Sequence, residues 1–177
     1  LEDRAWSSPT ASTQKTIPYG LPYWIVKNNT TGFNGSTAFG TSVAGVEMAD
    51  SPTFKNYTAQ YTNVSKADLI KKLRTAHRKT GFKSPITIQD YRGTQGQRYR
   101  LYVNESTISS LEELGEAQNE NLGRDLASMD GTITFRNHPV VWVPKLDSDT
   151  KDPVYGIDHS TFYPVCLTGD YLRESEA

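Results

Sequence analysis

The side chains best suited to acid–base or nucleophilic chemistry are the three histidines, His77, His138 and His159. A catalytic nucleophile needs a base within hydrogen-bond reach and a third group that orients this base. Ser160 and Asp158 flank His159, but neighbours on an extended chain point to opposite faces, so the three do not assemble a triad locally. The sequence also contains no Gly-X-Ser-X-Gly elbow, no His-Glu-X-X-His helix and no dinucleotide-binding glycine motif. We therefore expect a protein that is not an enzyme.

Three further patterns resemble ligand sites, and each lacks a required residue. Gly93 and Gly96 lie in a polar loop, yet no Lys-Ser/Thr pair follows them as in a phosphate-binding loop. The aspartates of 147–152 are spaced like those of a calcium loop, without its glycine and its distant glutamate. Cys166 is the single cysteine, and its apolar neighbours are typical of a buried, unreactive thiol. We expect neither a cofactor nor a metal ion.

Residues 65–80 give the clearest helix prediction, and this helix carries the candidate binding residues. Ser65 fits the N-cap position with Asp68 in the first turn, and Gly81 stands where a left-handed C-terminal cap is needed. Helical spacing predicts the buried stripe Leu69, Ile70, Leu73, Ala76 and His77, in which His77 is expected to be packed rather than to bind a ligand. The opposite face holds six cations: Lys66, Lys71, Lys72, Arg74, Arg78 and Lys79.

Two interpretations of these cations stay open. A stripe of positive charge suits salt-sensitive contact with the phosphates of DNA, independent of base sequence. The other interpretation is a solvated face that pairs with acidic patches on neighbouring molecules. We favour the second, because no aromatic residue alternates with the cations to stack on bases. The segment 112–130 is acidic, so the basic helix of one copy and the acidic segment of the next are expected to be able to meet head to tail.

β-Structure is expected mainly in the second half of the chain. Alternation or apolar runs predict a hairpin at 86–103 and strands at 132–136, 140–143, 153–157 and 161–167. Within the hairpin, Tyr99, Leu101 and Val103 share one face. Asn137-His138-Pro139 predicts a turn. The unbroken apolar run at 140–143, which includes Trp142, is typical of a strand covered on both faces.

A second helix, or two short ones, is expected at 107–127. Its expected buried stripe is Ile108, Leu111 and Leu114, and the candidates for its N-cap are Asn104, Ser106 and Thr107.

Residues 1–63 contain little regular structure beyond a short strand expected at 23–27. A segment of this length without regular structure is uncommon in a compact domain. An extended arm lying on an adjacent subunit would explain exposed aromatic residues such as Trp6, Tyr19 and Phe33. The equal alternative is a loop-rich cap that folds back on its own core.

The overall composition sets broad limits on the partners. The chain has 177 residues with a formal net charge of −1, so its bulk charge does not favour a polyanionic partner. No apolar run approaches the roughly 20 residues of a membrane span. Hydrophobic residues make up 36% of the chain, which indicates either many loops or burial completed by neighbouring molecules.

Several blocks along the chain together resemble one family. The blocks 111–126, 130–147 and 152–158 read LxxLxxxxxxNLGRDL, DGxxxFRxxPVVWVPxLD and DPVYGID, and shorter pieces precede them at 18–25, 32–35, 56–61 and 64–70. In this order they resemble the C-terminal half of the major capsid proteins of tailed phages and prophages, which have the HK97-like shell fold.

This resemblance implies an α+β fold with a spine helix, a mixed or antiparallel sheet domain and long irregular arms. It divides the chain into an extended arm or loop region (1–64), the spine helix with the start of a peripheral domain (65–90), and a sheet-and-helix, axial-like domain (91–177). Full-length shell subunits carry an N-terminal arm and further elements that we do not find here. Because the chain also starts at Leu1 without methionine, we expect it to be a fragment of such a subunit.

The implied function is structural: a self-assembling subunit of an icosahedral phage or prophage head, located in the virion after synthesis in the cytoplasm of the bacterial host. The implied partners are copies of the chain itself and, by analogy, scaffold and portal proteins and packaged DNA, with no membrane. Two rival functions stay open. One is a nucleic-acid-binding module that uses the basic helix 66–79. The other is a small-ligand or carbohydrate-binding β-domain with a concave pocket lined by Trp6, Trp24 and Tyr91.

Overall fold

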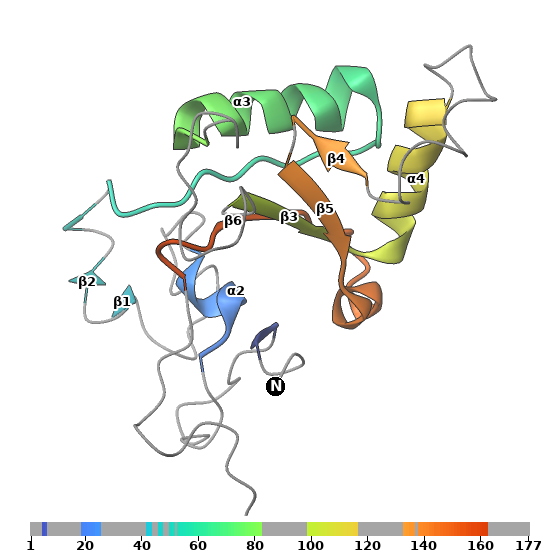
Figure 1. Cartoon of the computed structure of the whole chain (residues 1–177). Helices are drawn as coiled ribbons and strands as arrows, with labels where there is room; N and C mark the ends of the chain where they lie inside the picture. The colour runs from blue at the N-terminus through green and yellow to red at the C-terminus, as the bar shows by residue number, and fades with distance from the viewer. Residues whose placement is uncertain are drawn as a thin grey trace, which may run out of the picture.

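The computed structural model of the chain describes residues 5–6, 19–25, 42–43, 46–47, 50–51, 53–82, 99–116, 133–136 and 138–162. Within these ranges the protein has an α+β fold in which helices lie over one face of a four-stranded mixed sheet (Figure 1). A separate pair of two-residue strands, β1 (Ser42–Val43) and β2 (Val46–Glu47), forms a small antiparallel ladder that the sequence patterns did not predict.

The four-stranded sheet has the order β4-β5-β3-β6. Its central strand β3 (Tyr99–Val103) runs parallel to β5 (His138–Trp142) and antiparallel to β6 (Tyr155–Asp158). The short strand β4 (Thr134–Phe135) pairs with β5 as an antiparallel edge. Parallel neighbours need a crossover connection, and helix α4 (Glu105–Glu116) begins this connection directly after β3.

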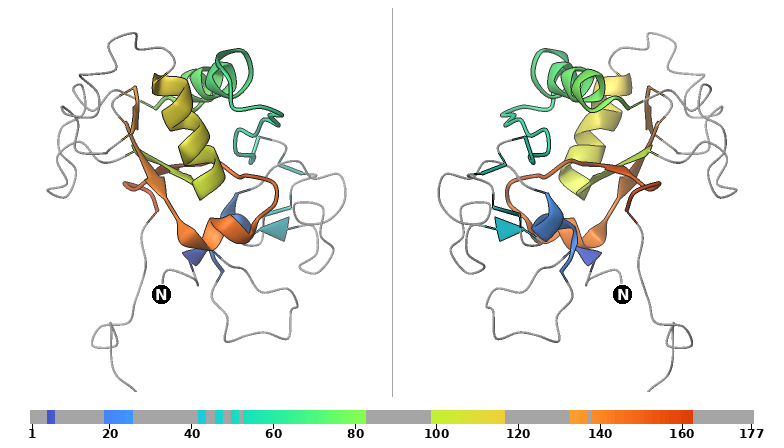
Figure 2. Two further views of the ribbon diagram at one scale, coloured as in Figure 1. Left: turned by 90° about the vertical axis from the view of Figure 1, so that its right-hand side faces the viewer. Right: turned by 90° about the vertical axis from the view of Figure 1, so that its left-hand side faces the viewer.

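Alternation along β3 separates the two faces of the sheet. Tyr99, Leu101 and Val103 are buried on one face, as their spacing predicts. The register places Val140 of β5 beside Leu101, and these residues form the centre of the core with Val103. Ile108 of α4 packs against this cluster, and Figure 2 shows α4 crossing the sheet on this side.

On the other face of the sheet, Trp6 packs against two tyrosines of the strands. The Trp6 ring lies 5.1 Å from the ring of Tyr102 and 5.4 Å from that of Tyr155. Tyr102 also shares a hydrogen bond of 2.7 Å between its hydroxyl and Nε2 of His159. Trp6 therefore packs on the sheet of its own chain, which for this residue favours the alternative of a cap on its own core. Phe33 lies outside the described residues.

The predicted helix at 65–80 forms as a π-helical segment, η1 (Lys66–Ile70), followed by α3 (Lys71–Thr80). The Ser65 hydroxyl accepts a hydrogen bond of 3.2 Å from the Asp68 amide, so the predicted N-cap is confirmed. At the other end Gly81 has φ 68°, the left-handed conformation that its position predicts. The π-helical turn, with the Ile70 amide donating to the Ser65 carbonyl, was not predicted.

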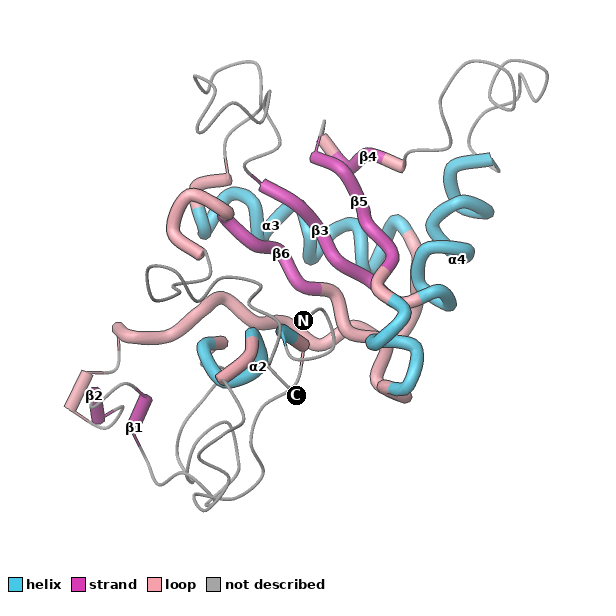
Figure 3. Tube along the Cα trace, turned by 60° about the horizontal axis from the view of Figure 1, so that its bottom comes forward, coloured by secondary structure: helices cyan, strands magenta, loops and turns pink. Residues whose placement is uncertain are grey.

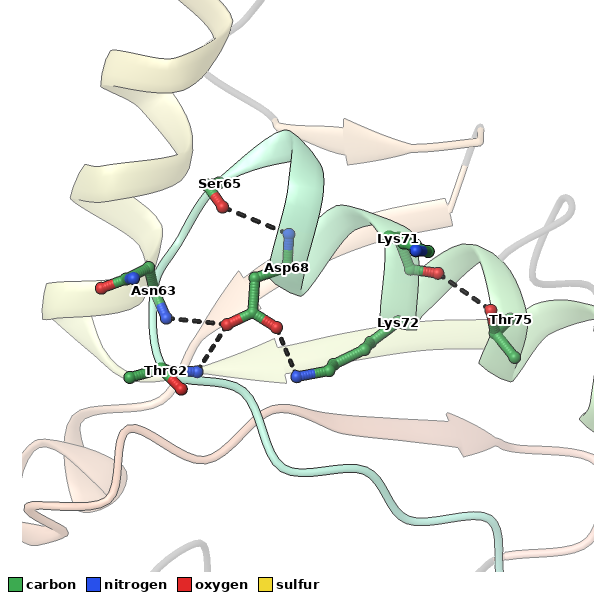
Figure 4. A network of polar contacts seen from close by, with 7 residues as sticks. All are labelled: Thr62, Asn63, Ser65, Asp68, Lys71, Lys72 and Thr75. Carbon is green, nitrogen blue, oxygen red and sulfur yellow. Dashed lines mark hydrogen bonds and ion pairs between the residues drawn. The ribbon is translucent and has the colours of Figure 1, made fainter.

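Asp68 fixes the start of this helix in space (Figure 4). Its carboxylate accepts hydrogen bonds from the amides of Thr62 (2.6 Å) and Asn63 (3.0 Å) and forms an ion pair with Lys72. These charge-assisted contacts lower the Asp68 pKa to about 2, with the Lys72 bond as the largest cause. The carboxylate therefore stays ionised and ties the incoming chain to the first helical turns.

The segment before this helix joins three parts of the fold. Residues 53–61 run as a loop beside α3 in Figure 1. The Tyr61 hydroxyl at the end of this loop donates to the carbonyl of Asp152 and lies 3.3 Å from the Thr107 hydroxyl of α4. The Asp152 carboxylate in turn accepts a hydrogen bond of 2.6 Å from the amide side chain of Asn104.

Helix α4 begins two residues earlier than the expected 107–127. Of the three cap candidates, Asn104 fills the role, because its side-chain oxygen accepts a hydrogen bond of 3.1 Å from the Thr107 amide. The stripe Ile108, Leu111 and Leu114 is half-buried rather than fully buried. Residues 117–127 lie outside the described part of the chain.

The strand expected at 23–27 is wrong, because Leu21–Trp24 forms the short helix α2. Pro22 lies in its first turn, where the fixed φ of proline suits a helix and its missing N–H costs nothing. Packing also favours the helical turn: Leu21 and Tyr23 are buried, and the centre of the Tyr23 ring lies 4.2 Å from that of Tyr19. Local chain geometry here overrides the strand preference of the aromatic residues.

The turn expected at Asn137-His138-Pro139 is also misplaced. Strand β5 already begins at His138, which pairs with Phe135 of β4, and the positive φ of 52° falls at Arg136. His138 belongs to the strand because its side chain enters the core, where only 1% of it is exposed. Pro139 interrupts no pairing with β3, since that ladder starts at Val140.

The prediction of a strand covered on both faces is wrong at Trp142. This side chain is 48% exposed, although Val140 and Val143 beside it are buried. Its indole N–H donates to both carboxylate oxygens of Asp147 at 3.1 Å. Asp147 lies in a 3-10 helix, η3 (Pro144–Ser148), which turns the chain directly after β5.

The remaining strand predictions are tested only in part. Strand β6 (Tyr155–Asp158) confirms the strand expected at 153–157, shifted by one to two residues. The first arm of the hairpin expected at 86–103 lies outside the described residues, and so does the strand expected at 161–167 beyond Phe162. At Leu101 and Tyr102 the described neighbours of β3 are β5 and β6. In the tube of Figure 3, β3 lies between these two strands.

Candidate functional site

The structure divides the six predicted cations into two groups. Lys72 is engaged by the Asp68 carboxylate, and the Lys79 ammonium lies 5.3 Å from the centre of the Tyr57 ring. The other four are exposed and have no hydrogen-bond or ion-pair partner among the described residues: Lys66, Lys71, Arg74 and Arg78. These four side chains are the part of the predicted stripe that is available to another molecule, and we call them the basic face.

The basic face lies opposite the buried side of the same helix. Leu69 and His77 are 2% and 4% exposed, as their place in the apolar stripe predicts. Lys71, Arg74 and Arg78 follow one another at intervals of three and four residues, so they share one side of α3. With about 1.5 Å of rise per residue, their charges extend over roughly 10 Å.

Helix α4 carries the opposite charge. Glu105, Glu112 and Glu113 are exposed, and none of them has an ion-pair partner in the described ranges. We call these three carboxylates the acidic face. The rest of the acidic segment, 117–130, lies outside the described residues.

Two of the three histidines come together in the core although they are distant in sequence. The rings of His77 and His138 stack with their centres 5.3 Å apart and their planes 13° apart. Nδ1 of His77 is 2.9 Å from the Leu73 carbonyl. Nε2 of His77 and Nδ1 of His138 have no hydrogen-bond partner in the described part of the chain. The rings of Phe82, Phe135 and Tyr99 surround the pair.

Burial lowers the pKa of both His77 and His138, because a buried imidazolium loses its hydration. The positive charge of Arg136 lowers the pKa of His77 further, and His77 does the same to His138. Both rings are therefore neutral at neutral pH. No hydroxyl or carboxylate of the described residues is bonded to either ring, so the pair has no nucleophile to activate. The prediction that His77 is a packed side chain is confirmed.

His159 does not join a triad with its neighbours. Its Nε2 contacts the Tyr102 hydroxyl, whereas the Asp158 carboxylate accepts a hydrogen bond of 2.9 Å from the Ser160 amide. Burial lowers the pKa of His159, and Arg100 lowers it further. Among the residues with described positions, no group of three His, Cys, Asp or Glu side chains could hold a metal ion.

A cavity of about 560 Å³ lies between α3, α2, β6 and the loop at 56–61. Apolar and aromatic side chains form much of its wall: Trp24, Tyr57, Leu73, Phe82, Ile157 and Phe162. Two polar groups at the wall are engaged within the chain, since Lys72 is paired with Asp68 and Asp152 with Asn104. The wall also includes His77, whose Nε2 has no partner among the described residues. A ligand site needs a few polar groups left to orient its ligand. Of the rings in the small-ligand hypothesis, Trp24 lines this cavity, Trp6 packs elsewhere on the sheet, and Tyr91 lies outside the described residues.

No described helix combines the length and the apolar character that crossing a lipid bilayer requires. No family model, no curated protein and no solved structure matches the sequence. The geometry of this chain is therefore the basis of the functional argument that follows.

Proposed function

We propose that this chain is a structural subunit of a phage or prophage icosahedral head shell with an HK97-like fold, and that it acts by self-assembly. The observation that carries this proposal is the long helix Lys66–Thr80 beside a four-stranded mixed sheet. These elements fit the spine helix and the sheet domain that the sequence resemblance to capsid proteins implies. The proposal includes the division at 1–64, 65–90 and 91–177, and the virion as the site of action.

The surface of the chain supports self-association. Four large apolar side chains are 43–50% exposed: Tyr19, Trp24, Phe54 and Trp142. The basic and acidic faces also lack partners in the described part of the same chain. Shell subunits bind several neighbours through modest contacts, and the closed shell gains stability by multiplying them. Scaffold and portal proteins and packaged DNA are further partners by analogy.

Electron microscopy and sedimentation velocity of the full-length protein, expressed with its genomic neighbours, test this proposal. We expect closed particles of uniform size. Trp142→Ser and Trp24→Ser should reduce particle yield while lowering the thermal unfolding temperature only modestly, since these rings are 48% and 43% exposed. Trp6→Ser is the matched control, because Trp6 packs on its own sheet and its loss should lower the unfolding temperature instead. Uniform monomers under all assembly conditions would overturn the proposal.

The second candidate function is a nucleic-acid-binding module. The four unpaired cations of the basic face favour it, because such a stripe can contact phosphates without reading bases. It predicts duplex DNA binding that weakens steeply with salt and is lost in Lys71→Gln/Arg74→Gln/Arg78→Gln. Lys72→Gln is the control, since Asp68 already neutralises Lys72. Binding that this control reduces as strongly as the triple variant would argue against a role of the basic face.

A further inference from the structure

Among the described residues, two helices each carry a group of exposed charges of one sign that has no ion-pair partner. Several other polar side chains are used within the chain: Asp68 by Lys72, Asp152 by Asn104, and Asp147 by the Trp142 indole. The basic face on η1–α3 and the acidic face on α4 have no such partners among the described residues. Figures 1 and 2 show α4 near the N-terminal end of the η1–α3 helix.

The two faces have the same spacing. Lys71 and Arg78 are seven residues apart on α3, and Glu105 and Glu112 are seven residues apart on α4. Seven residues are close to two helical turns, so each pair lies on one side of its helix with its Cα atoms about 10 Å apart. Two helices laid side by side can therefore match both pairs at once.

Helix dipoles decide which direction of the pairing is better. When the helices run antiparallel, the negative C-terminal end of α3 lies beside the positive N-terminal end of α4. This direction places Arg78 opposite Glu105 and Lys71 opposite Glu112. Arg78 can then form a bidentate contact with a carboxylate, which is stronger and more specific than a single bond.

We propose that the basic face of α3 on one copy docks antiparallel against the acidic face of α4 on the next copy, with Arg78–Glu105 and Lys71–Glu112 as the paired charges. This inference rests on the proposed function, self-assembly, and specifies one of its contacts. Because the two faces lie on different helices, each copy offers one face of each kind. The contact is therefore heterologous and propagates from copy to copy, as the contacts within a ring or a shell do.

A second copy fits these faces better than a nucleic acid does. A nucleic acid would pair with the basic face and leave the acidic face without a partner, whereas a copy of the chain satisfies both. The formal net charge of −1 also provides no overall attraction for a polyanion. No aromatic side chain of the described helix lies among the four cations to stack on bases.

Charge reversal with rescue by mixing tests the contact in the full chain. The first variant, Lys71→Glu/Arg78→Glu, has two negative faces, and the second, Glu105→Lys/Glu112→Lys, has two positive faces. Sedimentation velocity at about 50 mM and about 500 mM salt measures association, because exposed charges are screened at high salt. Circular dichroism confirms folding. Should the reversed charge at Glu105 disturb the first turn of α4, Glu112→Lys/Glu113→Lys replaces the second variant.

We expect each variant alone to associate at least about tenfold more weakly than the parent at low salt. The equimolar mixture should associate again, and so should the quadruple variant, whose two faces are exchanged. Lys55→Glu and Asp50→Lys are controls, because both side chains are exposed and lie outside the two helices. They should leave association unchanged.

The outcomes separate this inference from the proposed function. If the parent assembles and both reversed variants assemble equally well, the contact is wrong while self-assembly stands. The same conclusion follows if the mixture does not regain association. If the parent remains monomeric in all conditions, the proposed function itself is overturned. If duplex DNA binds the parent and only this binding is lost in Lys71→Glu/Arg78→Glu, the basic face serves a nucleic acid instead.

Discussion

The stacked histidines predict that mild acid destabilises the fold. His77 and His138 are 4% and 1% exposed, and burial lowers the pKa of each below its ordinary value of 6.5. The positive charge of Arg136 lowers the pKa of His77 further, and no described carboxylate bonds to either ring to raise it. As the pH falls below 6.5, the unfolded chain binds protons that the folded chain does not. Stability must therefore fall with pH in this window.

The size of the effect follows from the linkage between proton binding and stability. One proton bound only by the unfolded chain changes the free energy of unfolding by about 1.4 kcal/mol per pH unit. With both rings neutral in the fold, the slope for the pair should be about 1.4 kcal/mol per pH unit at pH 6.5, where each unfolded ring is half protonated, and should rise toward a limit of about 3 kcal/mol per pH unit at lower pH. This is a large fraction of the roughly 5–15 kcal/mol that is typical of a domain. His159, whose pKa is also lowered, adds a loss in the same direction.

Urea unfolding between pH 8 and pH 5 measures this slope directly. His77→Phe and His138→Phe each keep an aromatic ring in the core and should each remove about one proton from the slope. Phe135→Leu is the control, since it disturbs the packing of the same cluster without removing a titrating group, and it should lower stability by a similar amount at every pH. NMR titration of the imidazole rings should give midpoints below 6.5 for both histidines.

Two results would refute this reasoning. The first would be an unchanged slope of the unfolding free energy between pH 6.5 and pH 5 when His77→Phe and His138→Phe are combined. It would show that the two histidines titrate alike in the folded and unfolded chain. Imidazole midpoints above 6.5 would show that a negative group compensates for their burial. Asp68 does not contribute to the slope between pH 8 and pH 5. Its pKa is lowered from 3.8 to about 2, so the stability that its ionisation provides is lost only below this pH range.

Three further predictions concern the ends of the helices. Gly81→Ala should destabilise the protein by about 1–2 kcal/mol, because φ is 68° there, whereas Gly115→Ala in α4 should stabilise it by roughly 0.5–1 kcal/mol. An added Cβ meets no atom within 4 Å at either position, so thermal unfolding of the two variants isolates the backbone effect; equal shifts would contradict it. Asn104→Ala should cost about 1–3 kcal/mol in urea unfolding, since it removes the α4 cap and the partner of Asp152. Ser65→Ala should cost about 1 kcal/mol and Ser65→Thr much less, as measured by the same unfolding; equal losses would exclude a capping role.

The features that the sequence predicted correctly depend on residues close together in the chain. The helix at 65–80 has its cap, its apolar stripe and its terminal glycine within one short segment. The cap and the glycine are confirmed, whereas in the stripe Leu69 and His77 are buried and the other three residues are half-buried. The buried face of β3 follows from simple alternation. The Asp68–Lys72 pair has the i, i+4 spacing of a helical ion pair, so the sequence alone already indicates that Lys72 is not one of the free cations.

The features that the sequence did not predict depend on contacts between distant segments. Nothing in the local pattern around His77 or His138 indicates that their rings stack, because this contact needs helix α3 to lie against strand β5, which is distant in sequence. An apolar run likewise predicts burial only where a neighbour covers it. Trp142 stays exposed because the chain turns into η3 directly behind it and provides an acceptor, Asp147, for its indole.

The same distinction explains which charges are left for other molecules. Local pairing removes Lys72 from the basic stripe and uses the aspartates near the caps and turns, because these partners lie a few residues away or on an adjoining loop. Arg74 and Arg78 have no acidic residue three or four positions away on the helix. A contact between copies should therefore depend on these charges and not on Lys72. Lys72→Gln should weaken the start of the helix, while association between copies keeps its salt dependence. Lys71→Gln/Arg78→Gln should leave the start of the helix unchanged and should remove the salt dependence of association.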